Sequence, residues 1–118
     1  MVKEKIKYQE WLENCKDEEL INQLKEMDEE QIVNSFYKEL SFGTGGLRGT
    51  IGAGSNRMNV YTVAKASQGL ANYLNATYLS PVVCIGYDSR IKSDVFSKTT
   101  AEVMAANGIK VLIYDRLL

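Results

Sequence analysis

Histidine is absent from this sequence of 118 residues, and its absence excludes whole classes of chemistry. Without an imidazole, the chain cannot form Ser-His-Asp or Cys-His catalytic sites, or a histidine metal site. Cysteine is scarce, and the two that occur, Cys15 and Cys84, lie far apart and form no C-x-x-C pattern. We therefore expect buried or idle thiols rather than a disulfide framework.

Long apolar runs are also missing. No run approaches the roughly 18 residues that a membrane-spanning helix needs. Residues 1–5 mix charges and lack the apolar core of a signal peptide. With 45% hydrophobic and 25% charged residues, the composition is that of an ordinary soluble domain. The sequence predicts a cytoplasmic protein of about one domain that does not associate with membranes.

The net charge of −1 hides an uneven distribution. In residues 1–40, six lysines accompany eleven acidic residues, whereas residues 41–118 carry eight basic residues and four acidic ones. All four arginines lie in this second part. An acidic start argues against a nucleic-acid partner, which prefers a continuous basic face. An arginine-rich remainder suits an anionic small molecule.

The stretch Ser41–Gly54, here called the glycine loop, holds six of the nine glycines, with Arg48 at its centre. Glycine permits positive φ and close backbone approach, so successive N–H groups can converge on an anion. A guanidinium beside such a nest is typical of a phosphate site without a metal. The same composition also suits a flexible loop or a glycine-kinked hairpin. Neither a dinucleotide-binding fingerprint nor a P-loop fits, because Arg48 occupies the third glycine position and no Gly-Lys pair exists.

Residues 3–40 are predicted to form helices. An apolar stripe at helical spacing marks the first, Asp17 begins a second, and Asp28 caps a third. The acidic run Asp28–Glu30 is interpreted as a helix start rather than a metal site. The apolar positions of the three helices are Tyr8, Trp11, Leu12 and Cys15; Leu20, Leu24 and Met27; and Ile32, Val33, Phe36 and Leu40.

The rest of the chain predicts an α/β fold. Leu47 and Ile51 flank a short strand, and a helix follows over residues 62–75 with an apolar face of Val63, Ala66, Leu70, Ala71 and Leu74. The apolar run Val82–Ile85 is typical of a strand covered on both faces. Strand, helix and strand within about 35 residues predict a right-handed βαβ unit.

In this unit Ser93 is the predicted N-cap of a helix through Asn107, with Phe96, Thr100, Val103 and Met104 facing inward. Gly108 is the expected C′ residue, and residues 109–114 form the second strand. Asp88 and Arg90 follow the first strand, at the sheet edge where open α/β folds bind ligands. A salt-bridged turn explains this pair equally well.

Several motifs together resemble the α-D-phosphohexomutases. Phe42-Gly-Thr-Gly-Gly-Leu-Arg-Gly49 is similar to their N-terminal signature, and Ile85-Gly-Tyr-Asp-Ser-Arg90 and Ala105-Ala-Asn-Gly-Ile-Lys-Val111 also match. Asn56-Arg-Met-Asn59, followed by Tyr61-Thr-Val, Gln68-Gly-Leu and Tyr73-Leu, resembles the long phosphoglucomutase-type members. Trp11-Leu12 and Phe36-Tyr-Lys-Glu-Leu40 resemble their helical start.

This resemblance implies the first part of a four-domain enzyme. Residues 1–40 would be a helical leader, and residues 41–118 part of domain I, a three-layer αβα domain with a mixed sheet. Such enzymes interconvert glucose 1-phosphate and glucose 6-phosphate through a phosphoserine and a hexose 1,6-bisphosphate. Mg²⁺ holds the phosphoserine, and glucose 1,6-bisphosphate activates the enzyme. Phosphomannomutase and phosphopentomutase activities are alternatives within the family.

The resemblance also assigns site residues. Arg48 would contact the phosphoserine and the substrate phosphate, Thr44 and Gly45 would shape its loop, and Asp88 and Arg90 would support the site. Partners would be a phosphorylated hexose and the remaining domains of the enzyme.

Other family features are missing. No Thr-Ala-Ser-His-Asn-Pro nucleophile loop or Asp-x-Asp-x-Asp-Arg metal loop occurs, and neither Ser41, Ser55 nor Ser89 fits the nucleophile motif. We therefore expect this chain alone to be inactive, with no nucleophile and no metal ligands of its own. We also expect it to self-associate through an uncovered apolar face. The alternative from another class is a non-catalytic α/β module that binds a phosphorylated ligand or a partner.

Overall fold

The computed structural model of the chain describes residues 2–40, 42–43, 46–47, 49–86 and 92–114. It divides into two compact units, Met1–Thr62 and Val63–Leu118, which are described in turn. The proposed boundary between leader and domain, at residue 40, stays a prediction. Among the described residues, no helix is both long and apolar enough to cross a bilayer.

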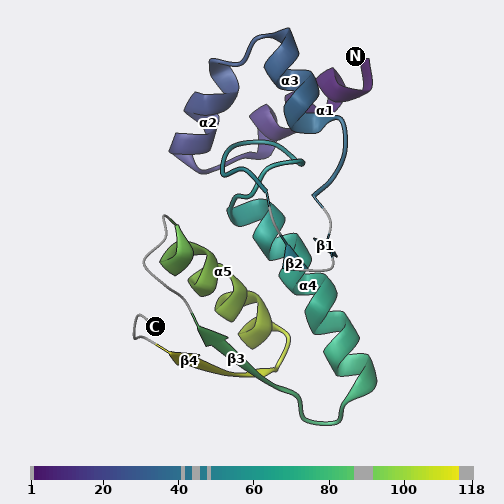
Figure 1. The fold of residues 1–118 in the computed structure, drawn as a ribbon, viewed down its shortest axis with the longest axis vertical. Helices are drawn as coiled ribbons and strands as arrows, with labels where there is room; N and C mark the ends of the chain where they lie inside the picture. Colours follow the sequence, from purple (N-terminus) through teal and green to yellow (C-terminus); the bar gives the residue numbers. More distant parts are fainter. Residues whose placement is uncertain (1, 41, 44–45, 48, 87–91, 115–118) are drawn as a thin grey trace. The chain divides into compact units, whose positions relative to one another are not determined.

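The first unit begins with three helices, α1 (Val2–Asn14), α2 (Glu18–Lys25) and α3 (Glu29–Phe36) (Figure 1). Asp17 caps α2, where its carboxylate accepts from the amide of Leu20 at 3.3 Å. Asp28 forms a capping box with Gln31, in which each side chain accepts from the other residue's amide, at 2.8 and 3.0 Å. Both predicted helix starts are confirmed, with Asp28 as the predicted cap, and Asp28–Glu30 is a helix start.

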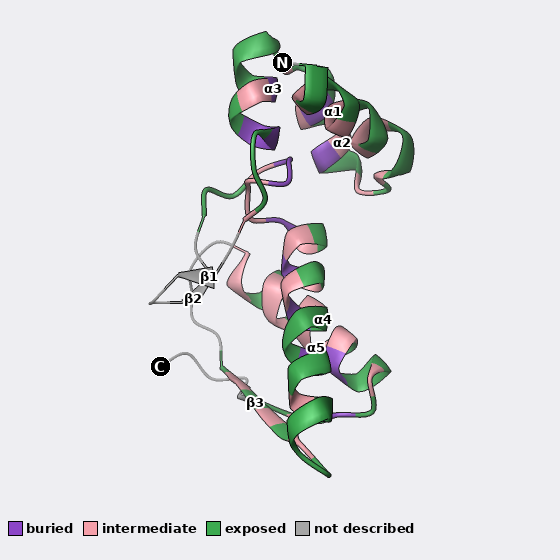
Figure 2. Cartoon of the chain, turned by 90° about the vertical axis from the view of Figure 1, so that its right-hand side faces the viewer, coloured by how far each residue is buried: buried purple, intermediate pink, exposed green. Residues whose placement is uncertain are grey.

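The core of this unit is formed by residues of α2 and α3 together with one residue from later in the chain. Its buried members are Leu20, Leu24, Ile32, Phe36 and Ala53. The predicted stripe of α1 packs against this core, and the rings of Tyr8 and Trp11 meet Phe36 edge-on at 6.1 and 5.6 Å. Figure 2 shows burial concentrated on the facing sides of α2 and α3. Edge-on aromatic packing adds to the energy of burial.

The third helix is shorter than predicted. It ends at Phe36 with Tyr37 as its C-cap, so the prediction that the helix runs to Leu40 is wrong. The amide of Leu40 instead donates to the carbonyl of Ser55 at 2.8 Å. The tertiary contact offers this amide an acceptor outside the helix, which the apolar spacing could not reveal.

Two very short strands follow, β1 (Phe42–Gly43) and β2 (Gly46–Leu47). They pair antiparallel, with Phe42 opposite Leu47 and Gly43 opposite Gly46. The hairpin interpretation of the glycine loop is therefore confirmed for these four residues. Ile51 forms an isolated parallel bridge with Met58, which closes a loop just before the next helix.

The long helix α4 (Val60–Thr77) starts in the first unit and continues in the second. It extends two residues beyond the predicted bounds at each end. Its buried line is Val63, Ser67 and Ala71, and Leu74 packs beside it, whereas Leu70 is exposed. The prediction that Leu70 faces inward is wrong. Ser67 takes part in the buried line because its hydroxyl donates to Thr100 of α5 at 3.0 Å.

The second unit contains a βαβ arrangement of β3 (Val82–Gly86), α5 (Ser93–Ala106) and β4 (Lys110–Tyr114). The two strands pair in parallel, with Val83 opposite Val111 and Cys84 opposite Leu112. The core joins these strands to α4 and α5 through Ala71, Met104, Ile109, Leu74, Val83 and Val111. The α/β fold class is confirmed.

Burial alternates along β3, and Val83 is its contact with this core. Val83 and Ile85 are half-buried, whereas Val82 and Cys84 are exposed, so a strand covered on both faces is wrong for this chain. The reason is that the core formed with α4 and α5 reaches only one side of the sheet. Val82, Cys84 and Leu112 lie on the open face together with Lys110, and Val82 and Leu112 are 53% and 49% exposed there. Cys84 and the half-buried Cys15 are free thiols.

The ends of α5 show one confirmed prediction and one shifted by a residue. Lys92, with φ of 69°, occupies the N-cap position, and Ser93 is the first helical residue rather than the cap. At the other end Gly108 has φ of 75°, as expected for C′. The amides of Gly108 and Ile109 donate to Ala105 and Met104, both at 3.0 Å. These two bonds form a complete Schellman motif, which satisfies the last carbonyls of the helix.

Candidate functional site

The residues to which the sequence assigns phosphate chemistry are Thr44, Gly45, Arg48, Asp88 and Arg90, and all five lie outside the described residues. The described part of the site is the stretch that directly follows Arg48. We call Gly49–Asn59 the anchor segment, because it connects the glycine loop to α4. Its hydrogen bonds define how this region is held.

The anchor segment binds the C-terminal end of α3. The backbone amide of Asn56 donates to the carbonyl of Ser35 at 2.9 Å, and its side-chain amide donates to the carbonyl of Asn34 at 3.2 Å. The Nη1 group of Arg57 also donates to Asn34, at 3.2 Å. The last carbonyls of a helix have no partner within it, and a cation is favourable there. The segment thus supplies hydrogen-bond donors to the last carbonyls of α3.

A second contact reaches α2. The side-chain oxygen of Gln23 accepts from the backbone amide of Ala53 at 2.9 Å. Ala53 itself is only 2% exposed and belongs to the core of the first unit. An amide at this depth needs a partner, because an unpaired buried N–H group is costly. Gln23 supplies it.

Two glycines allow the backbone to approach closely. Gly54 has φ of 124°, and a Cβ there would lie 2.6 Å from the carbonyl oxygen of Ser35. A Cβ on Gly49 would lie 2.7 Å from a methyl group of Leu40. Ser55 adds two bonds in the same region, as its hydroxyl donates to Lys38 at 2.9 Å and its carbonyl accepts from Leu40. Gly54 therefore depends on the absence of a side chain, because its close neighbour is backbone, whereas the neighbour of Gly49 is the end of a leucine side chain.

Asn59 connects the anchor segment to α4. It is 3% exposed, and its side-chain amide donates to the carbonyls of Gly52 and Gly54 at 2.9 and 3.1 Å. Its side-chain oxygen accepts from the amides of Tyr61 and Thr62, both at 3.0 Å, which caps α4. The hydroxyl of Thr62 accepts in return from the amide of Asn59 at 3.0 Å. One side chain therefore fixes both the turn and the start of the helix.

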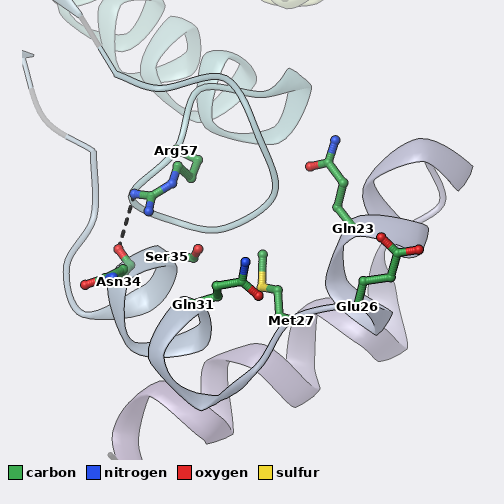
Figure 3. Close-up of a pocket in the computed structure, with 7 residues that line it drawn as sticks. All are labelled: Gln23, Glu26, Met27, Gln31, Asn34, Ser35 and Arg57. Carbon is green, nitrogen blue, oxygen red and sulfur yellow. Dashed lines mark hydrogen bonds between the residues drawn. The ribbon is translucent and has the colours of Figure 1, made fainter.

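A polar pocket of about 370 Å³ lies beside the anchor segment (Figure 3). It is lined by Gln23, Glu26, Met27, Gln31, Asn34, Ser35 and Arg57. Arg57 is the only cation of this lining, and its Nη1 group is bonded to the carbonyls of Asn34 and Asn56. In this position Arg57 holds the loop on α3.

The residues with the most contacts here were not singled out as site residues from the sequence. Asn59 carries a usable signal, since Asn-x-x-Thr before a helix is a capping pattern. Gln23 carries none, because a polar residue in an amphipathic helix is ordinarily solvated. Among the described residues, no group of three or more acidic or thiol side chains gathers closely enough to hold a metal ion.

Comparison with known proteins identifies the family. Residues 39–118 match the family model described as phosphoglucomutase/phosphomannomutase, alpha/beta/alpha domain I. The chain belongs to this family. All the residues that the resemblance assigned to the phosphate site lie within the matched range of this phosphoglucomutase/phosphomannomutase family: Thr44, Gly45, Arg48, Asp88 and Arg90.

Individual relatives agree with this assignment. The chain is 43% identical over 106 residues to a phosphoglucomutase of Staphylococcus saprophyticus, covering 89% of this chain and 19% of the relative. It is 39% identical over 116 residues to a probable phosphoribomutase of Schizosaccharomyces pombe, covering 92% and 20%. The similarity extends beyond residues 39–118 into the helical leader, because it covers more than those 80 residues can supply. The chain spans about a fifth of the length of these relatives, and no solved structure matches it significantly.

Proposed function

We propose that this chain is the N-terminal part of a phosphoglucomutase that interconverts glucose 1-phosphate and glucose 6-phosphate. The family match and the 43% identity to a phosphoglucomutase support this function. In the proposed reaction, the P–O bond of a phosphoserine breaks as a sugar hydroxyl oxygen bonds to phosphorus, which gives a hexose 1,6-bisphosphate. The second step returns the other phosphoryl group to the serine. The nucleophile and the Mg²⁺ ligands would come from outside this chain, which is then inactive alone, and the predicted cytoplasmic location is part of the same proposal.

In this proposal Arg48 stabilises the phosphoryl group during transfer. Phosphoryl transfer depends chiefly on positioning and on cationic stabilisation of the transferring group. Thr44 and Gly45 would shape the loop around the phosphate, and Asp88 and Arg90 would support the site from the end of β3. The observation that carries the assignment is the anchor segment, whose hydrogen bonds begin within a few residues of Arg48.

Ser55 can be set aside as the nucleophile on structural grounds. It is buried, and its hydroxyl donates to the carbonyl of Lys38 at 2.9 Å. A nucleophilic serine needs an exposed oxygen and a nearby base. This agrees with the proposal that the phosphoserine lies elsewhere in the intact enzyme.

A pentose phosphate is the second candidate substrate. It is favoured by the 39% identity to a protein named a probable phosphoribomutase. Parallel assays with glucose 1-phosphate, mannose 1-phosphate and ribose 1-phosphate would separate the three sugars by their kcat/KM values.

The test is the mass and mutase activity of the protein expressed from its native gene, with Mg²⁺ and a trace of glucose 1,6-bisphosphate. We expect an active product several times heavier than this chain. Arg48→Ala should lower kcat by about 10²–10³-fold, the usual effect of losing one group that stabilises the transition-state charge. The control is Lys98→Ala, which removes an exposed cation of α5 and should leave activity unchanged.

The opposite result would favour the alternative from another class. A native product of only this length that is inactive but binds a sugar phosphate would identify a non-catalytic module. The enzyme proposal would then be abandoned.

A further inference from the structure

We infer that the helical leader, residues 1–40, positions the glycine loop for the reaction by binding the anchor segment. Gln23 of α2 is one of its positioning residues. This inference rests on the proposed function, since it concerns the same loop. It assigns a role in the reaction to a part of the chain that lies almost entirely outside the matched domain, residues 39–118.

The first observation is that the anchor segment packs with the leader. Both belong to the first compact unit, which extends to Thr62. Three parts of the leader bind backbone and side-chain groups of the segment: Gln23 of α2, the carbonyls of Asn34 and Ser35 at the end of α3, and the stretch after α3 through Lys38 and Leu40.

The second observation is that these contacts are directional. Within the described part of the segment, Ala53 packs into the hydrophobic core, whereas the buried Ser55 and Asn59 are polar and are held by hydrogen bonds. Hydrogen bonds at 2.8–3.2 Å to three different parts of the leader restrict both its place and its orientation. Gly49, the residue after Arg48, already lies against Leu40.

The start of α4 is held by the leader as well. The hydroxyl of Tyr61 accepts from the amide of Lys16 at 2.8 Å, and its ring meets Trp11 edge-on at 5.7 Å. The anchor segment is therefore fixed along its length and at the helix that follows. Arg48 directly precedes this segment in the sequence, and a displacement of about 1 Å of a catalytic group can cost about 100-fold in rate.

Gln23 provides the sharpest test because it contacts the segment by one bond and is not assigned to substrate. We would measure kcat, KM and backbone hydrogen exchange for the native full-length protein and three variants. Gln23→Leu removes the acceptor for Ala53, and Gln23→Glu keeps a carboxylate oxygen in its place. Gln9→Leu makes the same substitution at an exposed position of α1.

We expect Gln23→Leu to lower kcat/KM about tenfold, within the range that misplacement of a catalytic group produces. Gln23→Glu should restore most of the activity, and Gln9→Leu should equal the wild type. In Gln23→Leu the amides of residues 52–58 should exchange faster, while those of α1 and α3 should not change. A variant that merely weakens the fold would show faster exchange in all of these elements.

Two outcomes are distinguished by this design. If the wild type is an active mutase and Gln23→Leu equals Gln9→Leu in both rate and exchange, the inference that the leader positions the glycine loop is wrong. If the wild type has no mutase activity but exchange at residues 52–58 still depends on Gln23, the proposed function fails, while the role of the leader in holding this segment is supported.

Discussion

Gly54 crosses the end of α3 so closely that a Cβ atom on it would lie 2.6 Å from the carbonyl oxygen of Ser35. No real Cβ atom approaches a backbone oxygen to that distance, and the φ of 124° is unfavourable for any residue with a side chain. The neighbouring amide of Asn56 donates to the same carbonyl at 2.9 Å. The close approach and the hydrogen bond form one docking contact.

Gly54→Ala should therefore destabilise the first unit. The strained conformation alone costs about 1–3 kcal/mol, and the contact with Ser35 adds to it. Urea unfolding followed by fluorescence of Trp11, which packs against Phe36, measures the change. The matched control is Gly69→Ala in α4, where a Cβ meets nothing within 4 Å. It should stabilise the helix by about 0.5–1 kcal/mol, and equal effects of the two substitutions would contradict the docking contact.

Gly108 provides a case of strain without a clash. Its φ is 75°, but a Cβ there would meet nothing within 4 Å. Gly108→Ala should cost about 1–2 kcal/mol from the left-handed conformation alone, and Gly108→Asn should cost less because asparagine tolerates it. Thermal unfolding followed by circular dichroism gives the order. Gly86→Ala, at an open position without positive φ, is the control and should show no comparable loss.

Asn59 should be one of the most sensitive residues outside the hydrophobic core. Asn59→Ala removes the cap of α4 and the donor to Gly52 and Gly54, so we expect a loss of about 2–4 kcal/mol. Asn59→Asp keeps the cap acceptor but turns a carboxylate oxygen toward these two carbonyls. It should retain the start of α4 and still lose the turn, which hydrogen exchange at residues 52–54 and 60–64 would separate. Wild-type stability of both variants would refute this role.

The open face of the sheet supports the expectation that the isolated chain self-associates. Val82 and Leu112 are about half exposed there, and Cys84 lies directly opposite Leu112 on the same face. Sedimentation over a range of concentrations should show a mass that rises with concentration, and Leu112→Lys should reduce this rise. Ile6→Lys replaces an equally exposed residue of α1 and should not reduce it. A monomer at all concentrations would count against the expectation.

Local features of this chain could be predicted from its residues. Caps at Asp17 and Asp28, the apolar stripe of α1 and the C′ position of Gly108 follow from interactions within a few residues of each other. Because these preferences act over one or two helical turns, the sequence alone is enough to place them. The family was likewise recognisable from its motifs, and the match of residues 39–118 confirms the family.

The tertiary structure decided the features that depend on distant residues. Leu40 lies outside the helix, where its amide donates to the carbonyl of Ser55, and Leu70 is exposed while the polar Ser67 is buried and donates to Thr100 of α5. Gln23 becomes a contact of the anchor segment only when residues 30 positions apart meet. Hydrophobic periodicity predicts which face of an element is buried, but a hydrogen bond between distant segments depends on where the fold brings them together.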